Sequence, residues 1–482
     1  MSRCRGGSTI ICRCEMPSLK SIEIEYYRGF YNSREIQFAL PNGEAGSGLT
    51  VIVGPNNAGK TSVLNALRLV LYPRQVDLEH RHANKILKIS LTTSEGAIRS
   101  VSNPDMGANL VSLGSSAWPS LDDVRVVPSR RSWAPYTHQQ TMEEGSYWQN
   151  AIHNMNEVQD AYLVSRVAAL TSERREQFDS LLRRLVPQIN TWRIELSRGQ
   201  TFVLYTTHSG ATHAADLFGD GMASLFRIAM ALLDSSAERV VAIDEPELSL
   251  HPQAQKSLAE VLSDFSKERQ IIITTHSPYF VNWSDIANGA VIFRLTQEKN
   301  GICVGALTAE TLMHLQTLTN DWQKPNLLDA VAREIFFADE VVFFEGQEDV
   351  GLLKKYAQEK GWCPLPAFGY GAGGAGNIIS FLGMAHDLGI PAVAVFDGDQ
   401  RSMHQDAIRK FPDALSLLLP TPDMRDKSKR DANGRETEEI NKIGIFDRRG
   451  VLKAEYEAYV EELFAKITSA LLEHPSVEKG VL

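Results

Sequence analysis

A glycine-rich stretch near the start of this 482-residue chain has the residue types that bind phosphate. Residues 54–61 read GPNNAGKT and fit the pattern G-x-x-x-x-G-K-[ST]. In this pattern the glycines let the backbone wrap phosphate groups, the lysine offers a charge to the β- and γ-phosphates, and the hydroxyl ligates magnesium. An apolar run precedes the stretch and a helical pattern follows it, as this chemistry requires. The sequence therefore predicts a nucleotide site made by Gly54, Asn56, Asn57, Gly59, Lys60, Thr61 and Ser62.

Two later apolar runs end in polar residues that suit the same site. Residues 240–243 are followed by Asp244 and Glu245, and residues 270–274 are closely followed by His276. Phosphoryl transfer needs one acid on the magnesium and another on the attacking water. We therefore expect Asp244 to ligate the metal together with Thr61, and Glu245 to act as general base. A lone histidine is more often structural, but three motifs in this order favour a contact between His276 and the γ-phosphate.

A second group of acids lies in the C-terminal part. Glu345 follows the apolar run 341–344, Asp349 falls in the first turn of the next helix, and Asp397 and Asp399 follow another apolar run. The carboxyl ends of parallel strands face one crevice, so these acids are expected to converge. Four carboxylates without a matching basic cluster repel one another unless divalent cations neutralise them. The sequence thus predicts that all four hold magnesium or manganese.

A competing interpretation of this region is a dinucleotide fold. Residues 371–376 match G-x-G-x-x-G, and Asp397 follows about twenty residues later, as in that fingerprint. The preceding Pro-Leu-Pro, 364–366, is a poor first strand, and a dinucleotide site gives no role to Glu345, Asp349 or Asp399. The metal interpretation is therefore preferred.

The elements that must position these residues have an α/β pattern. The first part reads as a strand pair over 19–38, a strand at 49–53, a helix at 62–71, a β-rich stretch over 88–127, a helical stretch over 157–184, helices at 225–233 and 252–265, and strands at 240–243 and 270–274. After a helix at 327–336, the second part reads strand 340–344, helix 350–360, glycine loop 369–376, helix 378–388 and strand 392–396, a rhythm typical of a parallel sheet. The polar stretch 421–442 is expected to be a mobile loop.

We expect four segments along the chain. Residues 1–15 are an over-extended start or a disordered tail, because a cleaner pattern opens at Met16. Residues 16–330 form an ATPase domain with a helical insertion at about 150–190. Residues 331–450 form a smaller parallel-sheet domain, and residues 451–482 form a C-terminal helical segment.

Composition limits the class of protein. Hydrophobic residues make up 43% and charged residues 22%, as in ordinary globular chains. No apolar run approaches the roughly 20 residues that cross a bilayer, so no membrane partner is expected. Five cysteines without a zinc-ligand array favour the reducing cytoplasm. The net charge of -10 argues against coating nucleic acid over the whole surface, although a local basic groove remains compatible with it.

The first part resembles the ATP-binding-cassette ATPases of the SMC and RecF type. The resemblance rests on the three motifs above and on residues 245–252, which read EPELSLHP. It implies that ATP is held between two head domains, hence a homodimer or a higher oligomer. Residues 217–224 replace the usual LSGGQ run, so either Gly221 or Ser224 is expected to meet the γ-phosphate of the other head at a helix N-terminus.

The second part looks like a Toprim domain, because Glu345-Gly-x-x-Asp349 is followed by Asp397-x-Asp399. An ATP-binding-cassette head followed by Toprim resembles the OLD (overcoming lysogenization defect) family of ATP-dependent endonucleases. The resemblance implies metal-dependent nicking or cutting of DNA, head-to-head dimers and roles in defence against phage, with a companion defence protein among the partners. Two cations would activate a water and stabilise the leaving 3′ oxygen.

The nuclease interpretation adds weaker candidates. Lys427 and Lys429 are candidates for a catalytic cation near the scissile phosphate, and each taken singly is more often a solvated surface lysine. Glu438 and Glu439 are candidates for a further metal ligand, and Arg130 and Arg131 for DNA or phosphate contact. Gln75 lies too close to the phosphate loop to serve as a glutamine loop.

Two other functions remain open from the sequence. One is an ATP-driven DNA sensor or clamp whose Toprim domain is non-cleaving or acts only with a partner. The other is a topoisomerase-like enzyme, which needs a nucleophilic tyrosine. Tyr370 lies near the crevice by sequence, but no separate tyrosine-bearing domain is evident. An ATP-controlled endonuclease is the leading prediction.

Overall fold

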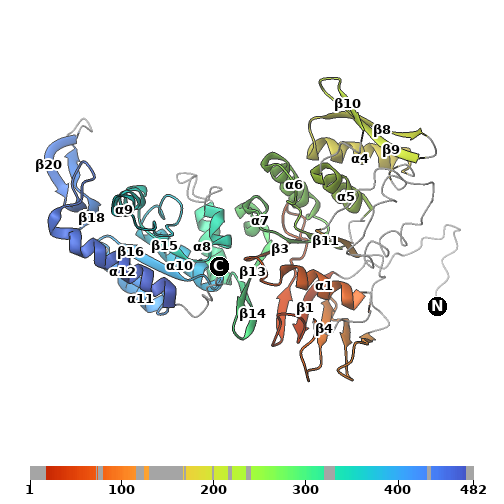
Figure 1. The fold of residues 1–482 in the computed structure, drawn as a ribbon, viewed down its shortest axis with the longest axis horizontal. Helices are drawn as coiled ribbons and strands as arrows, with labels where there is room; N and C mark the ends of the chain where they lie inside the picture. The colour runs from red at the N-terminus through yellow and green to blue at the C-terminus, as the bar shows by residue number, and fades with distance from the viewer. Residues whose placement is uncertain are drawn as a thin grey trace, which may run out of the picture.

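The computed structural model describes residues 18–71, 73, 80–114, 124–129, 167, 170–197, 200–214, 220–234, 240–319, 332–430 and 436–473. Two α/β parts lie side by side, the first running from red to green and the second from cyan to blue (Figure 1). The boundary expected near residue 330 and the segment 1–15 lie outside the described residues. Among the described helices, none is both long and apolar enough to span a bilayer.

A six-stranded sheet organises the first part. Its order is β14 (Gly301–Ala306), β13 (Val291–Glu298), β3 (Leu49–Val53), β12 (Gln270–Thr274), β11 (Val240–Asp244) and β7 (Val124–Val127). All neighbouring pairs are parallel except β13 with β14. Such a sheet, buried on both faces, requires the continuous apolar runs seen in the sequence.

Two layers cover the faces of this sheet. Ile52, Ala242 and Ile272 pack with α1 (Lys60–Leu71) and with a five-stranded antiparallel sheet. Val51, Ile243 and Ile273 face the other core with the helices α4 (Ser172–Leu185), α5 (Asp220–Asp234) and α6 (Pro252–Phe265). The five-stranded sheet has the order β2 (Arg34–Gln37), β1 (Leu19–Glu25), β4 (Lys88–Thr93), β5 (Ile98–Ser102) and β6 (Val111–Gly114).

Smaller elements complete the first part. They are the antiparallel sheet of β8 (Ile189–Ser197), β9 (Gln200–Thr207) and β10 (Thr212–Ala214), the 3-10 helix η4 (Pro278–Phe280), α7 (Trp283–Asn288) and α8 (Ala309–Thr319). The expected helix over 157–184 needs correction within its described residues. Thr171 is extended and caps the first turn of α4, so this helix begins at Ser172.

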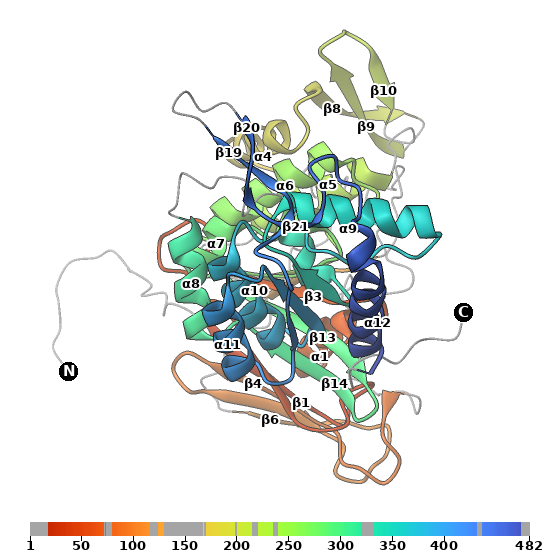
Figure 2. The same ribbon diagram turned by 90° about the vertical axis from the view of Figure 1, so that its left-hand side faces the viewer.

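The second part is built on a parallel sheet of β15 (Val341–Phe343), β16 (Ala392–Phe396) and β17 (Leu415–Leu418). Phe343 and Phe396 pack on the side of α10 (Ala375–Asp387) and α11 (Arg401–Lys410). Val342 and Val395 pack on the side of α9 (Gln347–Lys360) and α12 (Glu457–Glu473). Figure 2 shows α11 and α12 on opposite sides. The predicted parallel sheet is confirmed.

The prediction of a mobile loop over 421–442 is wrong. This stretch contains β18 (Asp423–Arg425), β19 (Lys427–Arg430) and β20 (Glu436–Lys442), and β18 pairs with β21 (Gly444–Phe446). Polar side chains do not prevent strand formation here, because β19 and β20 form an antiparallel hairpin whose described side chains are exposed or half-buried. The described part of the expected helix at 327–336 is the 3-10 helix η5 (Ala332–Phe337), and η6 (Ala454–Tyr456) precedes α12.

Candidate nucleotide and metal sites

The three nucleotide motifs meet at the carboxyl edge of the six-stranded sheet. Strand β12 lies between β3 and β11, so the segments after these three strands are neighbours. Thr61 Oγ1 lies 3.2 Å from both carboxylate oxygens of Asp244. Thr274 at the end of β12 also donates to Asp244. Asp244 is therefore held between the two strands and beside the hydroxyl with which we expect it to share a magnesium ion.

Lys60 points its charge into the loop that precedes α1. Its Nζ donates to the carbonyl oxygens of Gly54 and Pro55, at 2.9 and 2.8 Å. Burial lowers the pKa of Lys60 to about 8, although Glu245, Asp244 and Glu247 act in the opposite direction. A largely desolvated ammonium inside a loop of backbone groups is an arrangement that suits a phosphate.

Two glycines of this loop are required by space and by backbone conformation. Gly54 has φ +144°, and a Cβ there would lie 2.2 Å from the carbonyl oxygen of Leu295 in β13. Gly59 has φ +92°, and a Cβ there would lie 2.2 Å from Ile302 in β14. A side chain at Gly54 would therefore push the loop away from the backbone of β13, and one at Gly59 would displace the Ile302 side chain and strain the loop backbone.

The general-base candidate Glu245 adopts a strained backbone. Its φ is +48°, and its N–H donates to the carbonyl oxygen and the hydroxyl of Thr274. His276 Nε2 lies 3.8 Å from Glu245 Oε1, and burial lowers the pKa of His276. A left-handed conformation is uncommon at a residue other than glycine or asparagine, and such residues cluster at functional sites. The structure thus brings Glu245, His276 and Lys60 together, as expected.

Glu247 is a residue of this site to which the sequence analysis gave no role. One oxygen of its carboxylate accepts a 2.6 Å hydrogen bond from the backbone N–H of His276, and burial raises its pKa. Glu247 therefore links the segment after β11 to the segment after β12. The acidic residues within 244–247 were the feature of the sequence that could have indicated Glu247 as part of the site.

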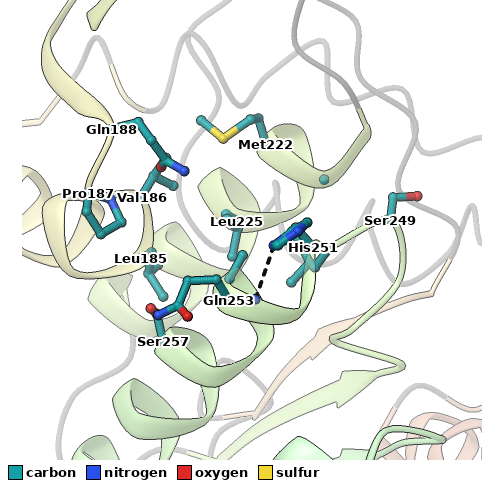
Figure 3. A pocket seen from close by; sticks show the side chains of 13 residues that line it. Leu185, Val186, Pro187, Gln188, Met222, Leu225, Ser249, His251, Gln253 and Ser257 are labelled. Carbon is teal, nitrogen blue, oxygen red and sulfur yellow. Dashed lines mark hydrogen bonds between the residues drawn. The ribbon is translucent and has the colours of Figure 1, made fainter. Parts of the chain in front are cut away.

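The first two turns of α5 hold the two candidates for contact with a second head. Ser224 is 2% exposed, so its hydroxyl does not lie on the surface that another head would meet. Gly221 is half-buried, and a Cβ there would lie 2.3 Å from the carbonyl oxygen of Ser249. Gly221, Ser249 and His251 contribute to a cavity of about 270 Å³ (Figure 3). Burial therefore favours Gly221 over Ser224 for this role, which stays a prediction.

The predicted acids of the second part converge as the strand order requires. Glu345 follows β15 and Asp397 follows β16, and Glu345 Oε1 accepts a 2.9 Å hydrogen bond from the backbone N–H of Asp397. Asp349 caps the first turn of α9 by accepting from the backbone N–H of Gly346 at 2.9 Å. Gly398 donates to the carbonyl oxygen of Thr421, which joins the ends of β16 and β17.

The carboxylates repel one another. Burial raises the pKa of Asp397 to about 8, with further contributions from Asp349, Glu345, Asp423 and Asp399. Burial also raises the pKa of Asp349 to about 6, and it raises the pKa of Glu345. Groups that resist ionisation in this way gain most from a nearby cation. The donor set therefore fits a divalent ion, although no three His, Cys, Asp or Glu side chains of the described residues are already grouped to hold one.

Asp423 is a fifth acid of this cluster that the sequence analysis missed. It is 7% exposed, it follows β17, and its charge raises the pKa values of Glu345, Asp349 and Asp397. No motif marks it in the sequence. Its place became visible only once β17 was found beside β16.

Three lysines differ in their access to this cluster. Lys427 Nζ lies 3.4 Å from Asp423 and 3.2 Å from Glu348. Lys429 instead pairs with Glu439, and both side chains are more than half exposed. Lys442, which the sequence analysis did not consider, lies 2.7 Å from Asp399, and this hydrogen bond raises its pKa. The structure thus favours Lys427 over Lys429 as a cation beside the acids.

Of the weaker candidates that remain from the sequence, only Glu439 has a described side chain. Glu439 pairs with Lys429 in the hairpin. Gln75, Arg130 and Arg131 lie outside the described residues, and nothing is described of the Glu438 side chain. The dinucleotide alternative lacks its first strand, because residues 364–366 form none and the segment contributes only an isolated bridge between Ala367 and Val342.

Comparison with known proteins supports both parts of this description. Family models match residues 127–282 (AAA domain, putative AbiEii toxin, Type IV TA system), 21–104 (AAA domain) and 336–399 (Overcoming lysogenization defect protein-like, TOPRIM domain). The chain thus joins a part that matches AAA domains to a part that matches an OLD-like Toprim domain. The order of these two parts is the one that the sequence analysis expected from its resemblance to the OLD family.

Curated relatives carry nuclease names. The OLD nuclease of Thermus scotoductus is 29% identical over 165 residues, which are 33% of this chain and 30% of that protein. Endonuclease GajA of Bacillus cereus is 29% identical over 172 residues, 30% of this chain and 25% of the relative. The Old nuclease of Escherichia phage P2 is 28% identical over 115 residues, 24% and 19% of the two chains. The matches span less than a third of these relatives.

Solved structures of SMC heads are also similar. One is an SMC head bound to the C-terminal winged-helix domain of ScpA, with a TM-score of 0.43, 16% identity and coverage of 62% of this chain and all of that one. Another, from Thermotoga maritima, has a TM-score of 0.38 and 14% identity, with coverage of 61% of this chain and all of that one.

Proposed function

We propose that the protein is an ATP-binding and ATP-hydrolysing DNA endonuclease that depends on a divalent metal. The observation that carries this proposal is the convergence of Glu345, Asp349 and Asp397 at one strand edge, with pKa values raised by burial and mutual repulsion. The OLD-like Toprim match over 336–399 and the nuclease names of the relatives support it.

In this proposal, Glu345, Asp349, Asp397 and Asp399 hold magnesium or manganese. A bound divalent ion would activate water and stabilise the developing charge on a phosphodiester. Asp423 adds negative charge beside them, and Lys427 lies at the margin, where a cation can bind a DNA phosphate. The 2.9 Å hydrogen bond from the Asp397 N–H orients the Glu345 carboxylate toward the end of β16.

The nucleotide site serves as the control element of this proposal. Lys60 and the backbone of residues 54–59 would bind the phosphates, Thr61 and Asp244 the magnesium, and Glu245 would take a proton from the attacking water. Gly221 at the start of α5 would complete the site of a second head, which makes a homodimer the expected assembly. Defence against phage and action with a companion protein belong to this proposal.

One observation favours a second function. Lys442 lies 2.7 Å from Asp399 and neutralises one acid of the cluster. Such a neutralised acid is what we expect of a DNA sensor or clamp that cleaves only with a partner.

The test is incubation of the purified protein with supercoiled plasmid and magnesium or manganese, with and without ATP. Metal-dependent nicking or linearisation supports the endonuclease. The comparison with and without ATP then shows whether ATP activates or inhibits cleavage. Intact ATP turnover with no cleavage under any condition refutes an autonomous endonuclease and supports the sensor.

A further inference from the structure

Arg294 lies where the two parts of the chain meet. It is 2% exposed, although it carries a guanidinium in the middle of β13. Its Nη2 donates to the carbonyl oxygen of Ala338 at 2.7 Å, and its Nη1 donates to that of Leu388 at 3.4 Å. Both acceptors belong to the second part. A buried charge is costly unless it is hydrogen-bonded, so these contacts hold the two parts together.

On one side, Arg294 is next to the phosphate-binding loop. In the parallel pairing of β13 with β3, Arg294 is opposite Val53, the last residue before Gly54. Gly54 packs so closely on the following residue, Leu295, that a Cβ would lie 2.2 Å from its carbonyl oxygen. A shift of the loop at Gly54 would therefore move the backbone of β13 at Leu295, next to Arg294.

On the other side, Arg294 binds the C-terminal end of α10 and the residue Ala338 before β15. The opposite end of each of these two elements contacts or precedes Glu345. Leu388 is the C-cap of α10, where the partial negative charge of a helix end favours a cation. At the other end of this helix, about 20 Å away for 13 residues, the N–H of Gly374 donates to the carbonyl oxygen of Glu345 at 3.0 Å. Ala338 precedes β15, and Glu345 follows the same strand.

Another contact at this junction has a less direct connection to the phosphate loop. The N–H and Oγ1 of Thr308 both lie 2.8 Å from Asp387 Oδ2, at the end of α10. Thr308 follows β14, an edge strand that pairs with β13 and not with β3. This strand meets the loop through the Ile302 side chain beside Gly59, whereas β13 meets it through its backbone. Thr308 can therefore serve as a control for a contact that holds the two parts together from a strand not paired with β3.

We propose that Arg294 is the positioning residue that couples the state of the nucleotide loop to the Toprim acids, through α10 and β15. This inference rests on the proposed function, because it assigns the route by which nucleotide controls the metal site. It predicts that nucleotide binding changes the protection of residues 371–388, which lie outside the nucleotide site.

The test uses amide hydrogen exchange of the full chain, with and without magnesium and the non-hydrolysable ATP analogue AMP-PNP. In the parent, we expect the analogue to protect residues 54–61 and to change exchange in residues 371–388 by about fivefold or more, the lower range of measured couplings between sites. In Arg294→Met, the loop should still be protected while the change in 371–388 is lost. Arg294→Lys keeps a charge without the two-pronged geometry and should lose most of the response.

Two control variants separate coupling from general loosening. Thr308→Val removes the hydroxyl that donates to Asp387 at the same junction, and Arg269→Met removes an arginine that donates to the Leu232 carbonyl oxygen within the first part. Both should keep the response of residues 371–388. The proposal is overturned if the parent shows no response there, if either Arg294 variant keeps the full response, or if both controls lose it. A parent that responds but cuts no DNA refutes only the nuclease function.

Discussion

Thr61 Oγ1 lies 3.2 Å from both carboxylate oxygens of Asp244, although 183 residues separate the two in the chain. The contact joins the start of α1 to the end of β11. Thr61→Ala and Asp244→Asn should each raise the magnesium concentration needed for ATP turnover by about 10- to 100-fold, a usual cost of losing a group that holds or orients a metal. Thr61→Ser keeps the hydroxyl and should stay near the parent. ATP turnover measured against magnesium concentration checks this, and unchanged magnesium dependence in Asp244→Asn would contradict the assignment.

Glu245→Gln should bind ATP but hydrolyse it about 10²- to 10⁴-fold more slowly, because the amide cannot accept a proton from the attacking water. If two heads share the nucleotide, the variant should accumulate as an ATP-bound dimer. Light scattering after size-exclusion chromatography in ATP and magnesium measures this. The control is Lys60→Ala, which should bind no nucleotide and form no such dimer. Parent-like turnover in Glu245→Gln would remove Glu245 from the role of general base.

Gly54→Ala should destabilise the protein by about 1–3 kcal/mol, the usual range for overpacking. A Cβ at Gly54 would lie 2.2 Å from the Leu295 carbonyl oxygen, and φ is +144°. The matched control is Gly351→Ala in α9, where a Cβ meets no atom within 4 Å. This control should stabilise the helix by roughly 0.5–1 kcal/mol. Urea unfolding midpoints of the two variants should therefore move in opposite directions, and equal shifts would contradict the packing argument.

Lys427→Ala should slow DNA cleavage by on the order of 10²-fold, the size expected when one positioned charge donor is lost. Lys427 lies 3.4 Å from Asp423 within the acid cluster. Lys429→Ala should change the rate by less than about fivefold, since exposed ion pairs such as Lys429–Glu439 contribute ~1 kcal/mol or less. Initial rates on supercoiled plasmid compare them. A larger loss in Lys429→Ala would reverse the assignment.

Many helices and strands could be predicted because their apolar residues form runs or periodic patterns bounded by polar residues. The predicted bounds of the helix at 252–265 and of the strands at 270–274 and 392–396 agree residue for residue with the structure. The helix shows a helical periodicity of apolar residues, and each strand contains a continuous apolar run between turns. These signals are local, so the sequence alone reveals them. The positions of Asp244, Glu345 and Asp397 followed, since a parallel sheet gathers the residues that end its strands.

What escaped prediction depends on contacts between distant segments. The stretch 421–442 is polar, so it gave no strand signal, yet Lys429 pairs with Glu439 across the hairpin and Lys442 reaches Asp399. Asp423 has no motif, and its place comes from the pairing of β16 with β17. The role of Arg294 required knowledge of which carbonyl groups surround it.

The central claim is that the acids of the second part cut DNA with the help of a metal. The most direct measurement compares plasmid cleavage by Glu345→Ala and Glu340→Ala with manganese present, alongside ATP turnover. Glu345 accepts the hydrogen bond from Asp397, whereas Glu340 lies just before the opposite end of β15. We expect Glu345→Ala to lose cleavage and keep ATP turnover, and Glu340→Ala to retain both. Cleavage by Glu345→Ala at the rate of the parent would show that the metal site lies elsewhere.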